Sequence, residues 1–534
     1  MNLDYVSPLP PVRSGIADYS VDLLPHLMER ADVRVIRLPD LPLAPELAAR
    51  WPMAPLEETG AGGRLPLYQM GNNRYHRGVL ELALRLPGVL TLHDVLLHHL
   101  LMDDTLGRQE PRSFWDYKDR LTRDHGWVGE ATALAKRWNA WGEAPVFALP
   151  AHRALLRRQR GVLVHSQWAA ELLAEEDPDL RVRAIPMGVP LPPEADAEAG
   201  RRLRERFGLP ADRPVLGSFG FQTPIKRTTS VIRALAAPGL EKVHLLVVGE
   251  AAPVLDLEGE ARRAGVADRV HVMGFVSFED FEAAIAAVDL CLNLRYPTAG
   301  ETSASLLRVL AAGRPAIVSD YAQFADLPPE VALRIPLGDE EPEALSAMLR
   351  ELLASPGRLA AMGAASRELV RVRHDPGRAA AAVVDACREL AHLPPPGDDP
   401  AGRAAVPAPS SVAWGDLPGE IEVSGADLPW PEGERRRLQI RVRNTGFARW
   451  LAGERGPGGV AVVVKLFVDE ELTRDLLAGR PWLALPRDLA PGEEIVLETD
   501  VRRPPGTAHL WIEPHLFGGL GLSKLGGPLW ERPI

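Results

Sequence analysis

The sequence has 534 residues, which exceeds the roughly 250–300 residues at which a single hydrophobic core stops growing, so we expect two or three domains. A hydrophobic fraction of 46% and a charged fraction of 25% are ordinary for a globular protein. The net charge is -11, and the sequence contains no long basic run. Both features argue against a nucleic-acid groove and against general attraction to anionic lipid. Any anionic substrate must therefore be bound by local groups.

Cys291 and Cys387 are the only cysteines, and neither has the spacing of a metal ligand, so we expect neither a disulfide framework nor a zinc site. The N-terminus lacks a basic start before an apolar stretch, and no later run approaches about 18 uncharged apolar residues. We therefore expect a cytoplasmic protein with no secretion signal and no membrane-spanning helix. Peripheral contact with the inner face of the membrane stays open, although no segment stands out for it.

Through about residue 392, short apolar runs alternate with longer helical patterns, which is typical of parallel α/β sheets. The runs expected as strands are Val33–Leu38, Val89–Leu92, Gly161–Val164, Val215–Phe219, Val243–Val248, Arg269–Met273, Leu290–Leu294 and Ala316–Val318. A proline-rich break at residues 186–193 predicts a hinge. We assign residues 1–195 and 196–392 to two Rossmann-like domains that face each other across a cleft.

The pattern changes after residue 392. A Pro/Ala-rich stretch predicts a linker at residues 393–412. Residues 413–534 then alternate short strands with turns, which predicts an immunoglobulin-like β-sandwich. The strands are expected at Leu438–Val442, Val460–Val468, Glu494–Asp500 and Ala508–Pro514.

The tryptophans of this β-module have two interpretations. Trp450, Trp482 and Trp511 could form a sugar-stacking face, but tryptophans of a sandwich are more often in its core, and we favour the core. Glycan recognition, docking of a protein partner and oligomerisation are the roles left open for the module.

Residues 220–227 (GFQTPIKR) follow an expected strand and place Lys226 and Arg227 on a loop that opens a helix. An enzyme that transfers sugar from a nucleoside diphosphate must stabilise the developing diphosphate, either with a divalent cation or with protein cations and donors. Two cations at a helix start provide the second solution. The alternative is a solvated surface pair; we favour function because open α/β sheets bind ligands at the carboxyl ends of their strands.

A second polar loop, residues 296–305 (YPTAGETSAS), follows the strand that contains Asn293. Thr302 or Ser303 could be a plain helix N-cap. Glu301 favours a functional site instead, because a carboxylate beside a phosphate site is useful mainly for hydrogen bonds to sugar hydroxyl groups.

In the first half, residues 7–19 follow the first strand, and Gly15 would allow a ligand to approach the backbone closely. This loop lacks the GxGxxG fingerprint of dinucleotide binding. His93 and Asp94 lie at another strand end, with His98 and His99 on the helix that follows. Adjacent histidines point to different faces of a helix, so we interpret His93 as a polar group of the cleft and the other two as structural.

Residues 71–76 (GNNRYH) form one more polar strand-end loop. Asn72 or Asn73 caps a helix in the simplest interpretation. The alternative, weighted equally, is acceptor binding by Asn72 and His76 together with Asp94.

Through about residue 392 the sequence resembles the retaining GT-B glycosyltransferases of family 4. The resemblance rests on the order of several motifs, each of them weak alone. These are residues 10–17 (PPVRSGIA), His93–Asp94, 164–166 (VHS), 185–189 (IPMGV), Lys226, 248–249 (VG), 272–276 (VMGFV) and 313–320 (GRPAIVSD).

The resemblance implies that the second domain holds the donor nucleotide and the first faces the acceptor, with no metal required. It places Gly15 and Lys226 at the diphosphate and the backbone of Gly274, Phe275 and Val276 at the base. It also implies that His93 orients or stabilises the reacting sugar. In the retaining mechanism usually assigned to the family, the leaving phosphate oxygen accepts the proton of the acceptor.

Two departures limit what is carried over. The family usually has an arginine five residues before the lysine, where this chain has Phe221, and Arg227 is the candidate replacement. The glutamate pair spaced E-x7-E is also altered, since counting back from residues 313–315 puts Gly300 and Arg308 at its two positions. The donor base and sugar are therefore not transferred, and Glu301 is expected to reach the donor from a shifted loop.

We expect a metal-independent hexosyltransferase that moves a sugar from a nucleotide sugar to a glycan or glycolipid acceptor, as in cell-surface polysaccharide synthesis. The expected catalytic residues are His93, Lys226 and Glu301, and the donor site adds Gly15, Arg227, Gly274, Phe275, Val276, Thr302 and Ser303. The alternatives are a nucleotide-sugar epimerase or hydrolase on the same fold, or a degenerate, non-catalytic glycan-binding subunit.

Overall fold

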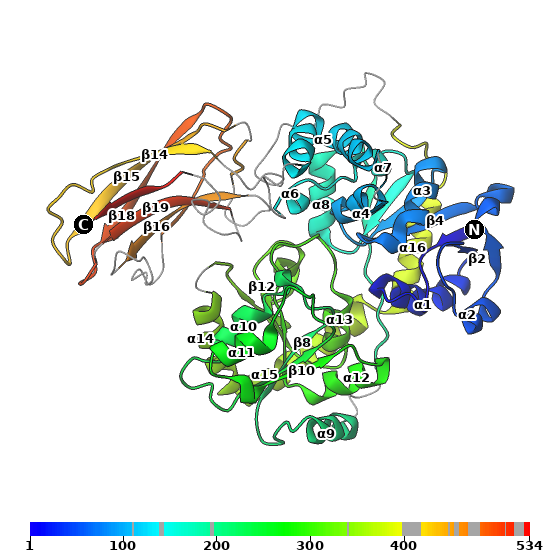
Figure 1. Cartoon of the computed structure of the whole chain (residues 1–534), viewed down its shortest axis with the longest axis horizontal. Coiled ribbons are helices and arrows are strands. Elements are labelled where there is room, and N and C mark those ends of the chain that lie inside the picture. The colour runs from blue at the N-terminus through cyan, green and yellow to red at the C-terminus, as the bar shows by residue number, and fades with distance from the viewer. Residues whose placement is uncertain are drawn as a thin grey trace. The chain divides into compact units, whose positions relative to one another are not determined.

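The computed structural model of the protein describes residues 1–108, 110, 112–137, 144–192, 197–338, 341–397, 418–446, 449–452, 459–467, 481–507, 509–516 and 528–533. The chain divides into two compact units, one of residues 1–140 with 150–402 and one of residues 141–149 with 403–534. Figure 1 shows two α/β domains in the first unit and antiparallel strands in the second.

The first sheet has seven parallel strands in the order β3-β2-β1-β4-β5-β6-β7. They are β1 (Asn2–Val6), β2 (Asp32–Arg37), β3 (Met53–Pro55), β4 (Leu65–Met70), β5 (Val89–Leu92), β6 (Gly161–Val164) and β7 (Val182–Ala184). The helices around it are α1 (Gly15–Met28), α2 (Pro45–Arg50), α3 (Arg77–Arg85), α4 (His98–Asp104), α5 (Ser113–Arg137), α7 (Arg153–Leu156) and α8 (Gln167–Glu176). Strands β4, β5 and β6 are buried along their whole lengths, which explains why their sequences are mostly apolar.

The second sheet has six parallel strands in the order β10-β9-β8-β11-β12-β13. They are β8 (Val215–Phe219), β9 (His244–Val248), β10 (Val270–Gly274), β11 (Leu290–Asn293), β12 (Ala316–Ser319) and β13 (Ala332–Ile335). The helices in this part of the sequence are α9 (Ala197–Arg206), α10 (Thr228–Ala234), α11 (Leu257–Arg263), α12 (Phe278–Ala287), α13 (Ala304–Ala311), α14 (Glu341–Leu353), α15 (Pro356–Arg373) and α16 (Pro376–Leu390).

All eight strands expected in this part of the chain are confirmed to within one residue at each end. Strands β1 and β4 were expected before the loops at residues 7–19 and 71–76. The three α/β strands that the pattern did not predict, β3, β7 and β13, all lie at sheet edges. Each has only three or four residues. A short edge strand carries few apolar side chains, so its sequence resembles that of a loop.

Helix α16 packs on the first α/β domain, although it follows the second domain in sequence. Gly161 in β6 makes room for it, because a Cβ atom at residue 161 would lie 2.5 Å from Leu390 Cδ1. Gly188, after β7, approaches the start of the helix in the same way, with Pro376 Cα 2.9 Å from the place of a Cβ atom. The predicted limits of 1–195 and 196–392 stay a proposal about domain boundaries.

The second unit holds two antiparallel sheets, ordered β14-β15-β18 and β17-β16-β19-β20. The strands are β14 (Gly419–Ser424), β15 (Arg435–Asn444), β16 (Val460–Phe467), β17 (Trp482–Ala484), β18 (Glu494–Arg502), β19 (His509–Leu516) and β20 (Trp530–Pro533). Helix α6 (Ala144–Ala148) is assigned to the same unit. An all-β domain is confirmed, and its immunoglobulin-like classification stays a prediction.

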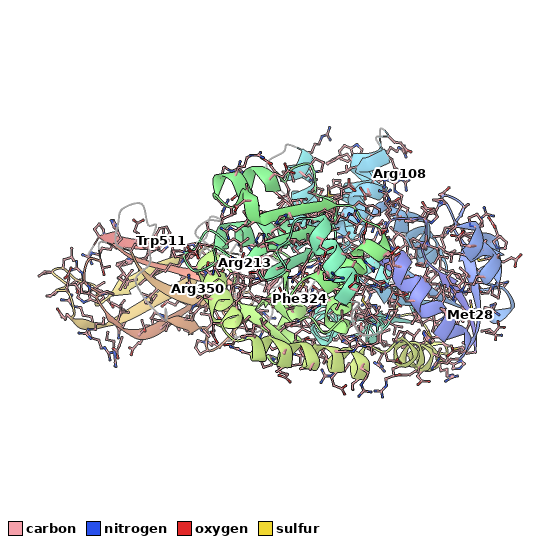
Figure 2. All side chains as sticks on the ribbon, turned by 90° about the horizontal axis from the view of Figure 1, so that it is seen from below. Met28, Arg108, Arg213, Phe324, Arg350 and Trp511 are labelled. Carbon is pink, nitrogen blue, oxygen red and sulfur yellow. The ribbon has the colours of Figure 1, made fainter. Side chains whose placement is uncertain are left out.

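The three tryptophans singled out in the sequence have different environments. Trp450 is fully buried in the core of the β-module, as expected. Trp482 pairs in register with Val463, and Trp511, labelled in Figure 2, pairs with Lys465. Because side chains alternate along β16 and its even-numbered valines face the core, Trp482 and Trp511 lie on the opposite face of that sheet. Core placement is thus correct for one tryptophan and wrong for the other two.

Both cysteines are buried and unpaired. Within the described ranges, no helix combines the length and the apolar composition needed to cross a bilayer. Residues 398–412 of the predicted linker lie outside the described residues, as do Val468 and Ala508 at the ends of two predicted strands.

Candidate active site

Lys226 ends a short 3-10 turn, η5 (Pro224–Lys226), after strand β8. Its side chain is 9% exposed, and its Nζ donates a hydrogen bond to the carbonyl oxygen of Phe219. Gly220 makes room for the ammonium group, since a Cβ atom there would lie 2.8 Å from Nζ. Burial, and then the positive charge of Arg295, lower the pKa of Lys226 to about 7. An anionic ligand would stabilise the charged form of this lysine.

Arg227 is held in a buried ion pair. It stands at the N-cap of α10, and its Nε lies 2.6 Å from both carboxylate oxygens of Glu341, which is 1% exposed. Phe221, where the resemblance expects an arginine, has an exposed side chain. Arg227 thus has a partner of its own, and the guanidinium group that lowers the pKa of Lys226 is that of Arg295.

Arg295 and Glu301 form an ion pair in the loop between β11 and α13. The hydroxyl group of Thr298 donates to Glu301 Oε2 over 2.8 Å, and the backbone N–H of Ala299 donates to the same oxygen over 3.0 Å. Arg295 Nε is buried and makes no hydrogen bond to a described residue. The loop therefore fixes Glu301 beside the two cations, Lys226 and Arg295, which we call the cation pair.

Ser303 is the N-cap of α13 and accepts a hydrogen bond from the backbone N–H of Leu306 over 3.3 Å. Its hydroxyl group also donates to Asn293 Oδ1 over 3.2 Å. Asn293 Nδ2 is buried without a partner among the described residues, and Thr302 is partly buried. The N-cap interpretation of Ser303 is thus observed, and phosphate binding by Thr302 and Ser303 is compatible with it, because the first amides of α13 remain available.

The loop after β10 carries the residues that are expected to contact the nucleotide base of the donor. Gly274 has a φ of 71°, and its carbonyl oxygen accepts a hydrogen bond from the backbone N–H of Gly249. Phe275 is 60% exposed, and the guanidinium group of Arg13, from the first α/β domain, lies 4.3 Å from its ring centroid. Val276 is partly buried beside it. The guanidinium group of Arg13 thus covers one face of the exposed Phe275 ring in a cation–π contact.

His93 and Asp94 follow β5 in the first α/β domain. His93 is 5% exposed, and its Nε2 lies 2.9 Å from Gln69 Oε1. Asp94 Oδ2 accepts a hydrogen bond from the backbone N–H of Asn72 over 2.8 Å. Burial, and then the negative charge of Glu301, raise the pKa of Asp94 to about 7. The structure therefore brings Asp94 of the first domain near Glu301 of the second.

The loop after β4 uses both of its asparagines as caps. Asn73 accepts a hydrogen bond from the backbone N–H of Tyr75 in the 3-10 turn η3 (Arg74–His76). Asn72 accepts one from the backbone N–H of Leu100, so it caps α4 instead of its own turn. His76 is fully buried, its Nε2 has no partner within the described part of the chain, and burial lowers its pKa to about 4. Acceptor binding by Asn72, His76 and Asp94 stays a prediction.

Three further expectations concern Gly15 and the paired histidines. A Cβ atom at Gly15 would meet nothing within 4 Å, so the loop before α1 leaves open space beside it. His98 Nε2 lies 2.7 Å from the hydroxyl group of Tyr117, whereas His99 Nδ1 lies 3.1 Å from Asn72 Nδ2. The two rings thus serve different structural contacts. Among the described residues, no group of three or more His, Cys, Asp or Glu side chains could hold a metal ion.

Two direct contacts join the α/β domains near these residues. The backbone N–H of Leu96 donates to the carbonyl oxygen of Ala299 over 3.0 Å. Arg308 forms an ion pair with Asp22 of α1, and both side chains are largely buried. Arg308, which stands at one of the two positions counted for the glutamate pair, therefore binds a carboxylate of the opposite domain.

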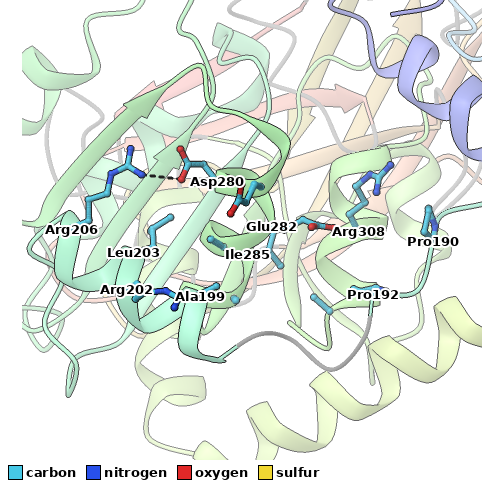
Figure 3. A pocket seen from close by; sticks show the side chains of 14 residues that line it. Pro190, Pro192, Ala199, Arg202, Leu203, Arg206, Asp280, Glu282, Ile285 and Arg308 are labelled. Atoms are coloured by element: carbon cyan, nitrogen blue, oxygen red, sulfur yellow. Dashed lines mark hydrogen bonds and ion pairs between the residues drawn. The ribbon is translucent and has the colours of Figure 1, made fainter. Parts of the chain in front are cut away.

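Arg308 also borders a pocket of about 410 Å³ between α9, α12 and α13 (Figure 3). Pro190 and Pro192 of the hinge line one side, and Arg206 forms an ion pair with Asp280 on the other. None of the predicted site residues lines this pocket. It is therefore separate from the cation pair.

Sequence reasoning missed Arg295, Gln69 and the two aromatic neighbours of His93. Tyr19 and His165 lie with their ring centroids 5.0 Å and 4.8 Å from that of His93. The position of Arg295, two residues after a buried strand, was the available signal for its role. Gln69 lies inside β4, where nothing in the sequence separates a functional glutamine from a structural one.

Comparisons with known proteins agree with the two-domain architecture. Residues 213–355 match the family described as "Glycosyl transferases group 1". The two α/β domains have the fold of solved structures that each cover 73% of this chain. Sucrose-phosphate synthase from Thermosynechococcus elongatus gives a TM-score of 0.52 at 19% identity over 99% of its chain. Anabaena Alr3699/HepE in complex with UDP gives a TM-score of 0.52 at 16% identity over 100% of its chain.

Two curated relatives are similar in sequence. The 2-deoxystreptamine glucosyltransferase of Streptomyces kanamyceticus is 28% identical over 231 residues, which are 42% of this chain and 54% of that protein. The D-inositol 3-phosphate glycosyltransferase of Xylanimonas cellulosilytica is 30% identical over 215 residues, which are 38% of this chain and 50% of that protein. The chain spans about half the length of these relatives. The predicted GT-B fold is confirmed, whereas placement in family 4 stays a prediction.

Proposed function

We propose that this protein is a glycosyltransferase that moves a sugar from a nucleoside-diphosphate sugar to a hydroxyl group of an acceptor. The bond between the anomeric carbon and the phosphate oxygen breaks, and a bond from that carbon to the acceptor oxygen forms. The acceptor proton leaves with the nucleoside diphosphate. Retention of the anomeric configuration belongs to the proposal and follows from the resemblance to family 4.

The cation pair is the observation that carries the proposal. Lys226 forms no ion pair with a described residue, and Arg295 has one carboxylate partner, Glu301. Burying two cations against one carboxylate is unfavourable unless an anion completes the site. The leaving diphosphate is such an anion, and the N-terminus of α13 adds backbone donors beside it.

The relatives support the same reaction class. Their names describe a glucosyltransferase and a glycosyltransferase, and the solved structure of HepE holds UDP. We place the nucleotide base at Phe275 and Val276, the diphosphate at Lys226, Arg295 and Ser303, and the donor sugar near Glu301 and His93. The acceptor, a glycan or glycolipid, then approaches from Asp94 and His76.

Metal independence is part of the proposal, because protein cations provide the charge that a divalent ion would otherwise bring. The test is a thermal-shift screen of the full-length protein against UDP, GDP, ADP, TDP and their sugars, followed by calorimetry with and without EDTA. One nucleoside diphosphate should stabilise the protein, and its affinity should survive EDTA. Absence of binding by every nucleotide would contradict the donor site, and loss of binding in EDTA would contradict metal independence.

Incubation of the donor alone separates the alternatives on the same fold. A hydrolase releases free sugar and an epimerase returns an altered nucleotide sugar, whereas a transferase needs an added acceptor for rapid turnover. The acceptors to be tested are an oligosaccharide, a glycolipid and a small cyclitol. The cyclitol is included because the names of both relatives mention one. Acceptor binding without release of nucleoside diphosphate would identify a non-catalytic glycan-binding subunit.

A further inference from the structure

A buried hydrogen-bonded chain leads to His93 from the interior of the first sheet. Gln69 in β4 and Thr91 in β5 are directly opposite each other in the parallel register. Gln69 Nε2 donates to Thr91 Oγ1 over 3.3 Å, and Gln69 Oε1 lies 2.9 Å from His93 Nε2. Gln69 and Thr91 are each 1% exposed, so no water competes for the amide from outside.

The Gln69 amide is oriented with its oxygen toward His93, and this orientation sets where the imidazole carries its proton. An amide oxygen only accepts hydrogen bonds, so the imidazole donates from Nε2. A neutral imidazole that carries its proton on Nε2 presents a lone pair on Nδ1. Within the described part of the chain, no hydrogen bond engages Nδ1 of His93.

The surroundings of His93 keep it neutral. Burial, and then His165 and His76, hold its pKa well below the usual value. The ring contacts Tyr19 from α1 and His165 after β6, and His76 from η3 lies near enough to lower the pKa of His93. None of these three is charged at neutral pH. Tyr19 Oη and His165 Nε2 are buried without a hydrogen-bond partner among the described residues. We call the side chains of His93, Tyr19, His165 and His76 the neutral cluster.

We infer that Gln69 is a positioning residue that holds His93 as a neutral imidazole protonated on Nε2, so that Nδ1 accepts a hydrogen bond from a substrate hydroxyl group. The inference rests on the proposed function, because it assigns the hydroxyl group to the transferred sugar or to the acceptor. A neutral acceptor atom cannot serve as a general acid or stabilise a phosphate. His93 thus binds and orients, and the charge chemistry stays with the cation pair.

The protonation state can be measured without turnover. The full-length protein is labelled with 15N-histidine, and His93 is assigned by comparison with His93→Asn. Wild type should show a neutral ring with its proton on Nε2 and no titration between about pH 5.5 and 8. A proton on Nδ1, or titration near the ordinary value, would overturn the inference.

Two variants test the role of the amide. In Gln69→Glu a carboxylate faces Nε2 and raises the pKa of His93, so the ring should become cationic toward low pH. In Thr91→Val the amide loses the hydroxyl group that orients it, and the ring should show a mixture of the two neutral forms. Unchanged histidine signals in both folded variants would contradict the positioning role.

Turnover with UDP-glucose as the probe donor gives a second readout. In Gln69→Glu, kcat should fall as the pH drops through its raised His93 pKa, level off at a loss of about tenfold and recover at high pH, whereas wild type stays flat there. Gln69→Leu should lose about tenfold at every pH. UDP affinity should not change in either variant. A pH profile of Gln69→Glu that matches wild type overturns the inference, whereas failure of all the screened nucleoside diphosphates to bind any form overturns the proposed function and leaves the histidine measurement valid.

Deoxy analogues of UDP-glucose and of the acceptor show which substrate carries the hydroxyl group that binds Nδ1 of His93. The analogue that lacks the relevant hydroxyl group should be equally poor with wild type and Gln69→Leu, because the bond is already missing. If Gln69→Leu reduced the turnover of every analogue by the same factor as that of the intact substrates, the hydrogen bond to Nδ1 would be refuted.

Discussion

The carboxyl edges of the two parallel sheets differ in charge. At the second sheet lie Lys226, Arg295 and Glu301, all ionisable and two of them cationic. At the first sheet lies the neutral cluster, in which burial lowers the pKa of every histidine. The same fold thus provides one edge with two cations and one edge whose histidines and Tyr19 are uncharged, with Asp94, of pKa about 7, beside them. The difference fits the two tasks of the proposed sugar transfer, stabilising a diphosphate and orienting hydroxyl groups.

The largest expected effect is that of Lys226→Ala on the charged edge. Removal of one preorganised group that stabilises a developing oxyanion lowers turnover by about 100- to 1000-fold, and we expect the upper end. Steady-state kinetics with the donor found in the nucleotide screen measures it. Lys242→Ala, an exposed lysine of the same domain, is the matched control and should keep wild-type turnover. A loss below tenfold for Lys226→Ala would contradict the assignment of diphosphate stabilisation to the charged edge.

Variants of Arg295 and Arg227 should differ in effect: the first should weaken nucleotide binding and the second should lower the stability of the fold. Arg295→Gln removes half of the cation pair and should weaken nucleoside-diphosphate binding by about tenfold to 100-fold, as expected for a hydrogen bond to a charged group. Arg227→Gln leaves Glu341 buried without its partner and should lower the free energy of unfolding by about 3 kcal/mol. Calorimetry and thermal unfolding of both variants measure the two quantities. The reverse pattern would identify Arg227 as the substitute for the missing arginine.

A substitution in the neutral cluster should affect turnover without affecting nucleotide affinity. His93→Asn removes one hydrogen bond to a hydroxyl group, and we expect a decrease of about tenfold in kcat. The affinity for the nucleoside diphosphate, measured by calorimetry, should stay within twofold of wild type. A parallel loss of nucleotide affinity would show that the neutral edge also contacts the diphosphate.

The smallest expected effect is the uptake of less than one proton per protein molecule when the nucleoside diphosphate binds. The pKa of Lys226 is about 7 in the free protein, and a bound diphosphate raises it, so binding above pH 7 must take up a proton. At pH 7.5 roughly half a proton or more should be taken up, which calorimetry in two buffers of different ionisation enthalpy can measure. Affinity should fall as pH rises above 7. Lys226→Met should bind without proton uptake.

Much of this arrangement follows from sequence pattern. The strands stand out because sheets covered on both faces need apolar runs, and the loops after them must carry the polar side chains. Lys226, Glu301 and His93 were found in this way. Arg227 was predicted in the donor site beside Lys226, but its ion pair with Glu341 was not predicted, because the two residues are 114 positions apart and no local pattern couples them. Trp482 and Trp511 were misplaced because β16 is buried on both faces, so alternation could not separate the core face from the other.

Arg295 and Gln69 show a second limit of sequence reasoning. An arginine after a strand has the same local sequence whether it faces water or a second cation. A glutamine within a strand likewise gives no sign that it is bonded to a histidine one strand away. Their roles depend on contacts between strands, and these are set by register.

The return of α16 to the first domain has a practical consequence for cutting the chain into fragments. A piece that stops before residue 376 would contain both sheets, yet it would leave an apolar furrow where Leu390 rests against Gly161. Expression of the first domain alone would meet the same problem. Fragments intended for crystallisation or for exchange with other enzymes should therefore keep residues 376–390 together with residues 1–184.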